Sequence, residues 1–287
     1  MHELKHQPPT AFPNVSPRWL LKATILVMIA AVAFAWLALC LLYWQGSWQL
    51  LYHPTAAITR TPADAAILYE PVKFAAMETG QPQLTGWWLP DSNANRTVLD
   101  LHGADGNMSN TVDTLAALHS AGLAVFAIDY RGYGQSIPAR PNEKQLRQDA
   151  EWALTWLTLT RNLAAKNIVI YGTGLGATVA LELAADHNEL AGVILDQPQQ
   201  NAMAPVFNDS RSHLVPAHWL VKDRYDLSTA AQSLKVPSLW LLDASQSAAG
   251  PQAYTQAPGQ KTEVWLKTPI PTDPHFGEEL RRWLDNL

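Results

Sequence analysis

The stretch IVIYGTGLGATVALELAADHNELAGVILDQP, residues 168–198, combines residue types and spacings that could do chemistry. An apolar run ends in the glycine cluster GTGLG and passes directly into a helical pattern. Such a strand, turn and helix can present a catalytic serine as G-x-S-x-G, and Gly174 would then stand at the serine position. It can also cradle a dinucleotide as G-x-G-x-x-A, with an acidic residue about twenty positions farther on holding the ribose. The residues of that second interpretation are Gly172, Gly174, Ala177 and Asp196.

Polar and glycine-rich loops also follow the neighbouring apolar runs. HGADGN begins at His102, DYRGYGQS begins at Asp129, and Asp243 ends the run VPSLWLLD. His275 stands just before the last helical pattern. Since the carboxyl ends of parallel strands meet at one edge of a sheet, we expect these loops to form one site.

The elements that would position this site alternate between strand and helix patterns. A hairpin pair at 70–77 and 84–90 is expected first, and a less regular stretch is expected at 199–235. The alternation predicts an α/β fold with a mostly parallel sheet and helices on both faces. The expected strands are 97–103, 123–130, 167–172, 191–198, 236–243 and 262–267, and the expected helices are 110–122, 143–160, 177–185 and 278–286.

The segment 23–44 carries no charged residue, and its length suits a helix that crosses about 30 Å of hydrocarbon. It exceeds the apolar region of a cleaved signal peptide. Positive charges precede it, whereas the first one after it is Arg60, so the positive-inside rule predicts a single-pass, N-in protein of the inner (cytoplasmic) membrane. The large domain would face the periplasm or exterior. The expected divisions are a cytoplasmic tail at 1–22, the transmembrane helix at 23–44, a linker at 45–65 and the domain at 66–287.

Composition excludes several classes of protein. Cys40 is the only cysteine and lies inside the apolar segment, so the domain has no disulfide and no thiol nucleophile. The whole chain carries a formal charge of −5, which argues against nucleic acid as a partner. His213 and His218 lack a third ligand at a recognisable metal spacing, so no zinc site is expected.

Five motifs in the same order resemble the α/β-hydrolase superfamily, in particular its membrane-anchored serine hydrolases. They are LYHP, LTGWWLP, LHGADGN, AIDYRGYGQS and HWLVKDRYDLSTAAQSLKVPSLWL. The resemblance spans most of 51–287. A dinucleotide site is disfavoured, because such a glycine loop usually follows the first strand of its sheet, whereas several expected strands precede this one. No cofactor is therefore expected.

The resemblance implies a role for each part of the site. The oxyanion donors would be the N–H groups of Leu175 and Ala104, and the catalytic histidine would be His275. Gly174 takes the nucleophile position and offers no atom for attack. Gln246 takes the position of the acid, and either Asp243 or Asp196 could substitute for it.

These substitutions favour a pseudoenzyme that acts as a binding or scaffolding module and keeps a pocket for a small apolar acyl ligand. The segment 199–235 would form a cap over that pocket. The alternative is an active ester or amide hydrolase that uses a non-standard nucleophile or a water activated by His275. Whether the chain is an enzyme thus depends on Gly174 and Gln246.

Overall fold

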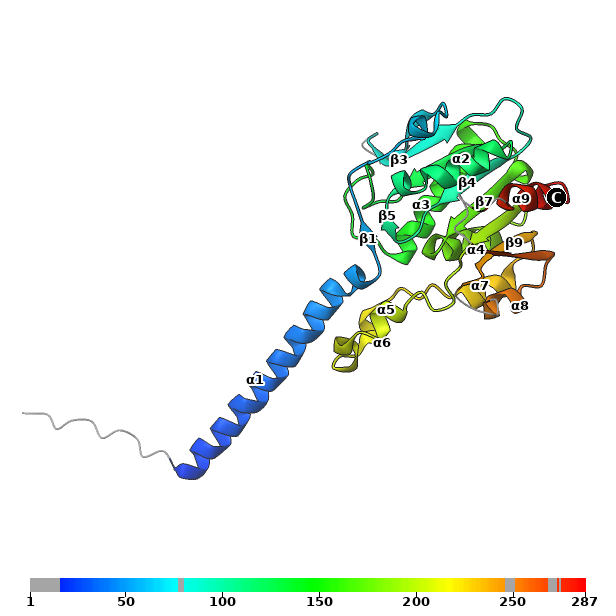
Figure 1. Cartoon of the computed structure of the whole chain (residues 1–287). Coiled ribbons are helices and arrows are strands. Elements are labelled where there is room, and N and C mark those ends of the chain that lie inside the picture. Colours follow the sequence, from blue (N-terminus) through cyan, green and yellow to red (C-terminus); the bar gives the residue numbers. More distant parts are fainter. Residues whose placement is uncertain (1–15, 77–79, 246–250, 268–272, 274) are drawn as a thin grey trace, which may run out of the picture.

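A long apolar helix stands out from the rest of the molecule (Figure 1). The computed structural model describes residues 16–76, 80–245, 251–267, 273 and 275–287. Helix α1 spans Pro17–Gly46. Ser16 caps its N-terminus, because the Ser16 side chain accepts a hydrogen bond from the N–H of Trp19. In the described part of the chain it is the one helix long and apolar enough to cross a membrane, and little of its surface is buried.

The domain is built on an eight-stranded sheet in the order β10-β9-β8-β7-β4-β6-β3-β2. The pairs β2–β3 and β3–β6 are antiparallel, and the other neighbours are parallel. This arrangement confirms the predicted fold class. The strands are β2 (Glu70–Ala76), β3 (Pro82–Leu89), β4 (Thr97–Leu101), β6 (Ala124–Asp129), β7 (Ile168–Thr173), β8 (Gly192–Asp196), β9 (Ser238–Asp243) and β10 (Lys261–Leu266).

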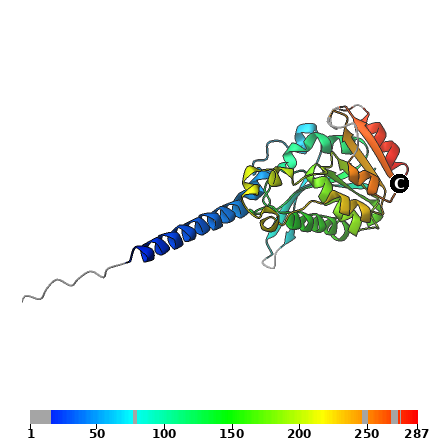
Figure 2. The ribbon, with the colours of Figure 1, turned by 90° about the horizontal axis from the view of Figure 1, so that it is seen from below.

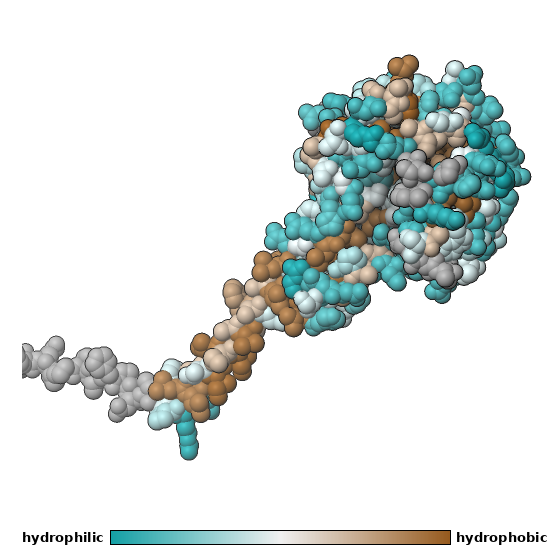
Figure 3. Space-filling view, viewed as in Figure 1, coloured by the Kyte–Doolittle hydropathy of each residue, from teal (hydrophilic) through white to brown (hydrophobic). Residues whose placement is uncertain are grey.

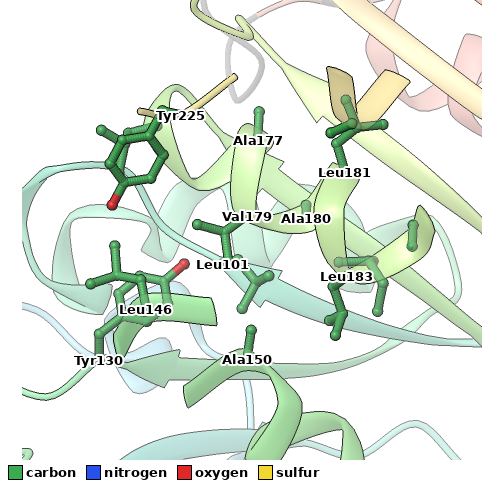
Figure 4. Close-up of a cluster of buried hydrophobic side chains, with 14 of the residues drawn as sticks. Leu101, Tyr130, Leu146, Ala150, Ala177, Val179, Ala180, Leu181, Leu183 and Tyr225 are labelled. Atoms are coloured by element: carbon green, nitrogen blue, oxygen red, sulfur yellow. The ribbon is translucent and has the colours of Figure 1, made fainter. Parts of the chain in front are cut away.

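Helices cover both faces of the sheet because successive strand residues point to opposite sides. Leu99 and Leu101 face a core shared with α3 (Glu143–Thr155), α4 (Leu175–Asp186), α7 (Leu227–Ser233) and α8 (Gln252–Gln256), part of which is drawn in Figure 4. Val98 faces a second core shared with α2 (Val112–Ser120) and α9 (Phe276–Leu284). The α9 layer matters for the site, because His275 directly precedes that helix.

The segment between α1 and β2 is packed against the domain, although the sequence suggested a linker there. It contains two 3₁₀ turns, η1 (Ser47–Leu50) and η2 (Pro62–Ala65), and the short strand β1 (His53–Pro54), which pairs in parallel with β5 (Asp105–Gly106). Tyr52 is fully buried, and its hydroxyl bonds the carboxylate of Asp223 at 2.7 Å. The end of α1 is therefore joined to the domain by core contacts.

Short helical turns make up the expected irregular stretch. The segment 203–220, which we call the cap, contains α5 (Ala204–Phe207), η6 (Ser210–His213) and α6 (Ala217–Leu220). It lies beside the upper part of α1 in two perpendicular views (Figures 1 and 2). Further single turns are η3 (Met108–Asn110), η4 (Trp156–Thr160) and η5 (Ala165–Asn167).

The helix expected at 143–160 changes its hydrogen-bond pattern before it ends. After α3, residues Trp156–Thr160 form a π-helical turn. The ring of Trp156 stacks on Phe126 with 4.3 Å between centroids. Such a turn arises from tertiary packing, which the helical periodicity of the sequence does not encode.

Candidate active-site region

Gly174 forms the sharp turn between β7 and α4, the position at which a hydrolase presents its nucleophile. Its backbone has φ +57° and ψ −113°, and its N–H donates to the carbonyl of Asp196 at 2.8 Å. The residue is thus held in a left-handed conformation that L side chains adopt only with strain.

The three glycines of this turn differ in how closely other atoms surround them. A Cβ on Gly172 would lie 2.4 Å from the carbonyl oxygen of Gly176, and a Cβ on Gly176 would lie 2.2 Å from that of Leu101. A Cβ on Gly174 would meet nothing nearer than the side-chain nitrogen of Gln199, at 3.7 Å. Close packing therefore demands the outer two glycines, whereas the central position has room for a side chain.

Thr173 is the hydroxyl residue nearest to this position in the sequence. Its Oγ1 lies 3.5 Å from Oδ2 of Asp196, and its side chain is partly buried. The hydroxyl is directed toward the neighbouring strand. This geometry does not support a nucleophile shifted by one residue.

The two expected oxyanion donors lie in well-anchored segments. Leu175 is the first residue of α4, so its N–H belongs to the first turn, where backbone donors have no partner within the helix. The carbonyl of Ala104 accepts hydrogen bonds from the N–H of His53 at 3.0 Å and from the hydroxyl of Tyr133 at 2.9 Å. The peptide chain at Ala104 is thus fixed by strand β1 and by the DYRGYG loop.

A buried histidine and aspartate support the loop that carries Ala104. The Nδ1 of His102 bonds the carbonyl of Gly103 at 2.8 Å, and its Nε2 lies 3.6 Å from Oδ1 of Asp129. The same oxygen of Asp129 accepts the N–H of Met108 at 2.8 Å. Burial lowers the pKa of His102 to about 4 and raises that of Asp129 to about 7. The contact therefore joins an uncharged imidazole to a carboxyl group that readily takes up a proton, and it is not a strong ion pair.

Sequence reasoning did not assign roles to His102 and Asp129. Both stand in motifs that carried the resemblance, HGADGN and DYRGYGQS. The His102 ring meets Tyr130 and Tyr133 edge to face, at 4.7 and 4.9 Å between centroids. His102 and Asp129 hold the loop that carries Ala104, a role that the motif residues alone do not reveal.

Asp196, one candidate for the acid, lies at the end of β8 and is buried. The hydroxyl of Tyr171 donates to its Oδ2 at 2.8 Å, and its Oδ1 is buried without a hydrogen-bond partner among the described residues. Burial raises the pKa of Asp196 to about 6. Burial, and to a smaller degree the charge of Asp196, raises the pKa of Asp100 to about 7. The two carboxyl groups thus form an inner polar cluster with Tyr171.

Asp243, the other candidate, ends β9 and is partly buried. Its Oδ1 accepts the N–H of Ser245 at 2.8 Å and the hydroxyl of the same residue at 2.7 Å. It therefore stabilises the turn that follows the strand. Gln246, at the position expected for the acid, lies outside the described residues.

His275 is exposed at the start of α9, and its N–H donates to Oδ1 of Asp273 at 2.9 Å. Asp196 and Asp243 lie two residues after Ile194 and Leu241, which face the α9 layer, so their side chains leave the sheet on that same face. Within the described ranges, however, no hydrogen bond joins the ring of His275 to either carboxylate. The structure thus brings the three residues to one side of the sheet.

The cap holds the two histidines considered for zinc. His213 belongs to η6, and the ring of His218 stacks on Phe207 with 4.2 Å between centroids. In the described part of the chain, no group of three or more His, Cys, Asp or Glu residues is placed to hold a metal ion.

A cavity of about 460 Å³ lies between the end of α1, the cap and the start of α3. Its lining includes Trp44, Trp48, Arg140, Met203 and Lys222. None of the three expected positions Gly174, Leu175 and Ala104 lines it. This cavity is therefore distinct from the turn at the end of β7.

Comparison with known proteins identifies related sequences. The family model "Serine aminopeptidase, S33" (Hydrolase_4) matches residues 92–248, more than half of the chain. The match includes Gly174 and Gln246 but ends before His275.

Two relatives share sequence similarity with this chain over different shares of its length. The chain is 28% identical to the uncharacterized protein Rv2307c of Mycobacterium tuberculosis over 249 residues, covering 82% of this chain and 86% of the relative. It is 32% identical to the uncharacterized membrane protein YNL320W of Saccharomyces cerevisiae over 138 residues, covering 47% and 48%.

Solved structures share the fold at low sequence identity. An esterase of Pyrococcus furiosus, Pf2001, superimposes with a TM-score of 0.63 at 19% identity, covering 82% of this chain and 96% of the esterase. An α/β-hydrolase of Vibrio vulnificus gives 0.59 at 20% identity, covering 76% and 79%. These matches show the α/β-hydrolase fold.

Proposed function

This chain belongs to the serine aminopeptidase S33 family of the α/β-hydrolase superfamily, and we propose that within it the chain is a catalytically impaired member that acts as a membrane-anchored binding or scaffolding module. Covalent hydrolysis by this fold requires an oxygen nucleophile, an imidazole base and an orienting carboxylate. The proposal is that the first and third of these are missing at Gly174 and Gln246.

The observation that carries the proposal is the turn at Gly174. It keeps the left-handed backbone of a nucleophile-bearing turn and has room for a Cβ, yet it bears no side chain. The flanking glycines remain where packing demands them. The neighbouring Thr173 is directed to Asp196, which supports the view that no adjacent hydroxyl takes over.

The expected ligand is a small apolar acyl compound. The N–H groups of Leu175 and Ala104 would receive its carbonyl or carboxylate oxygen, because helix N-termini and oriented backbone donors favour negative charge. His275 would lie at the edge of this pocket. Ligand binding of this kind needs no nucleophile.

The proposed anchor is α1, with the chain N-in in the cytoplasmic membrane and the domain outside. Support comes from its apolar length and from Lys22 and Arg18 on its N-terminal side. Protease added to the outer face should digest the domain and spare the tail at 1–22. Protection of the domain until the membrane is permeabilised would contradict this orientation.

Labelling of the full chain with a fluorophosphonate probe tests the loss of catalysis. The native chain should not label, whereas Gly174→Ser should label weakly, because it supplies the oxygen but not the acid. Gly174→Ala is the matched control, since it adds the Cβ without the hydroxyl. Strong labelling of the native chain at a serine or threonine, located by mass spectrometry, would overturn the proposal in favour of an active hydrolase.

A further inference from the structure

One stripe of α1 contacts the cap. Trp36, Cys40 and Tyr43 are spaced by four and three residues, so they lie on one face of the helix. The Nε1 of Trp36 donates to the carbonyl of Leu214 at 3.0 Å, and the hydroxyl of Tyr43 donates to that of Val206 at 2.8 Å. Cys40 and Tyr43 are the buried residues of α1, and most of the remainder of the helix is exposed.

These contacts place the cap alongside the apolar part of α1. Trp36 lies eight residues before Trp44, the end of the apolar segment 23–44, and at 1.5 Å per residue this corresponds to about 12 Å along the helix axis. The hydrocarbon core of a bilayer is about 30 Å thick, so a level about 12 Å inside one end still lies within one leaflet. If α1 spans the membrane, the part of the cap around Leu214, which we call its tip, reaches into the leaflet on the side of the domain.

The tip of the cap has side chains suited to that environment. Trp219 is 87% exposed and Leu214 is 61% exposed. The charged residues of the tip are paired, since Asp209 Oδ1 accepts Nε of Arg211 at 2.7 Å. Pairing reduces the free energy needed to bring charged groups near the acyl chains.

Cationic and aromatic groups lie on the domain side of the cap. Arg140 donates through Nη2 to the carbonyl of Trp44 at 2.7 Å, and its guanidinium lies 5.8 and 5.9 Å from the rings of Trp44 and Trp48. Exposed Lys144 and Lys222 line the 460 Å³ cavity beside them. Figure 3 shows the apolar surface of α1 continuing up to this region. An order of apolar, aromatic and cationic groups along one axis is the order found across a membrane interface.

We propose that the cap is a second membrane contact, whose tip residues Leu214 and Trp219 insert into the lipid leaflet beside α1. The occupant of this exposed apolar surface is thus the bilayer itself. The cavity, which Arg140, Lys144 and Lys222 line together with Glu143 and Asp223, then opens at the level of the lipid phosphates. The inference rests on the proposed anchoring by α1 and extends it, because the domain is held against the membrane surface rather than tethered at a distance.

Depth-dependent fluorescence quenching of the full chain in phosphatidylcholine–phosphatidylglycerol vesicles tests this inference. Single cysteines carrying a fluorescent label are introduced in a Cys40→Ala background, as Trp219→Cys, Leu214→Cys, Phe34→Cys and Leu68→Cys. Phe34 reports on the anchor. Leu68 is the matched control because it is as exposed as Trp219, at 87%, and follows η2 (Pro62–Ala65), which lies across the domain from α1 (Figure 1).

Lipids with a nitroxide on the acyl chain should quench the labels at 214 and 219 roughly two-fold or more, and a nitroxide near the methyl end should also quench the label at 34. The label at 68 should be unaffected by either. Quenching at 34 with values at 214 and 219 equal to that at 68 would overturn the membrane contact of the cap and leave the anchor intact. An unquenched label at 34 would instead refute the anchor. Labels at 214 and 219 shielded from both lipid nitroxides and aqueous iodide would show a protein partner or a second copy on this surface, which also overturns the inference.

Discussion

The two halves of the candidate site differ in how firmly the fold holds them. On the oxyanion side, the loop with Ala104 is fixed by His53, Tyr133 and the buried pair His102–Asp129. On the other side, Gly174 has room for a Cβ beside Gln199, and His275 is exposed.

This difference indicates which constraints come from folding and which come from chemistry. Gly176 and Asp129 satisfy packing and backbone hydrogen bonds, so replacing either would cost stability whether or not the protein turns over a substrate. A nucleophilic serine or an orienting aspartate makes no such contribution and can even be destabilising. A site that keeps the first kind of residue and lacks the second fits a fold retained for binding.

The largest expected effect comes from introducing an acid at position 246, where we propose that the orienting carboxylate is missing. In the Gly174→Ser background, Gln246→Asp should raise the rate of fluorophosphonate labelling by on the order of 10⁴-fold, the factor that an orienting carboxylate contributes in serine proteases. Labelling rates of the single and double variants, measured by mass spectrometry, provide the test.

The control for this experiment uses the two alternative acids. If Asp243 or Asp196 already orients His275, Gly174→Ser alone should label rapidly, and adding Asp243→Asn or Asp196→Asn should abolish that labelling. Rapid labelling of the single variant would therefore contradict the missing acid and identify the substitute.

The glycines of the turn should differ strongly in their effect on stability. Gly176→Ala should lower the free energy of unfolding by about 4 kcal/mol or more, because its Cβ would overlap the carbonyls of Leu101 and His102. Gly174→Ala should cost only about 1–2 kcal/mol, from the left-handed backbone. Denaturant unfolding of the full chain in detergent would compare them, and equal losses would show that the central position is as crowded as its neighbours.

The sequence predicted the sheet and the glycine turn because strand periodicity and glycine spacing are local properties. It did not predict the packing of 47–65, where Tyr52 reaches Asp223 and Tyr225 from 171 and 173 residues away. Nor did it indicate the cap on α1, since Trp36 and Leu214 each look ordinary in their own segments. Contacts of this kind depend on tertiary approach, which no short pattern encodes.

A smaller effect is expected from the buried carboxyl Asp196. Its pKa is raised to about 6 in the folded chain, so the folded state holds a proton that the unfolded state releases, and stability falls as the pH rises from about 4 through 6. Asp196→Asn removes this dependence while an amide oxygen can still accept from Tyr171. Relative to the native chain, the variant should gain on the order of 2 kcal/mol between pH 4 and pH 7. Parallel stability curves for the two proteins would show that Asp196 ionises normally.

The smallest expected effect on stability comes from replacing His275, the candidate catalytic histidine. His275→Ala should change the free energy of unfolding by less than about 0.5 kcal/mol, as for other exposed positions without a special contact. Thermal unfolding alongside His102→Ala, which removes a buried ring, would show the contrast. A large loss for His275→Ala would mean that the two halves are equally integrated into the fold.

The hydrogen bond between Trp36 and Leu214 joins residues 178 positions apart, which sets the order of events during biosynthesis. At about 5–20 residues per second, the ribosome needs on the order of 10–35 s to make the intervening chain. The indole of Trp36 emerges long before its acceptor exists. The last stages of folding therefore take place on a nascent domain already attached to α1, where tethering raises the local concentration of the two partners and favours their late association.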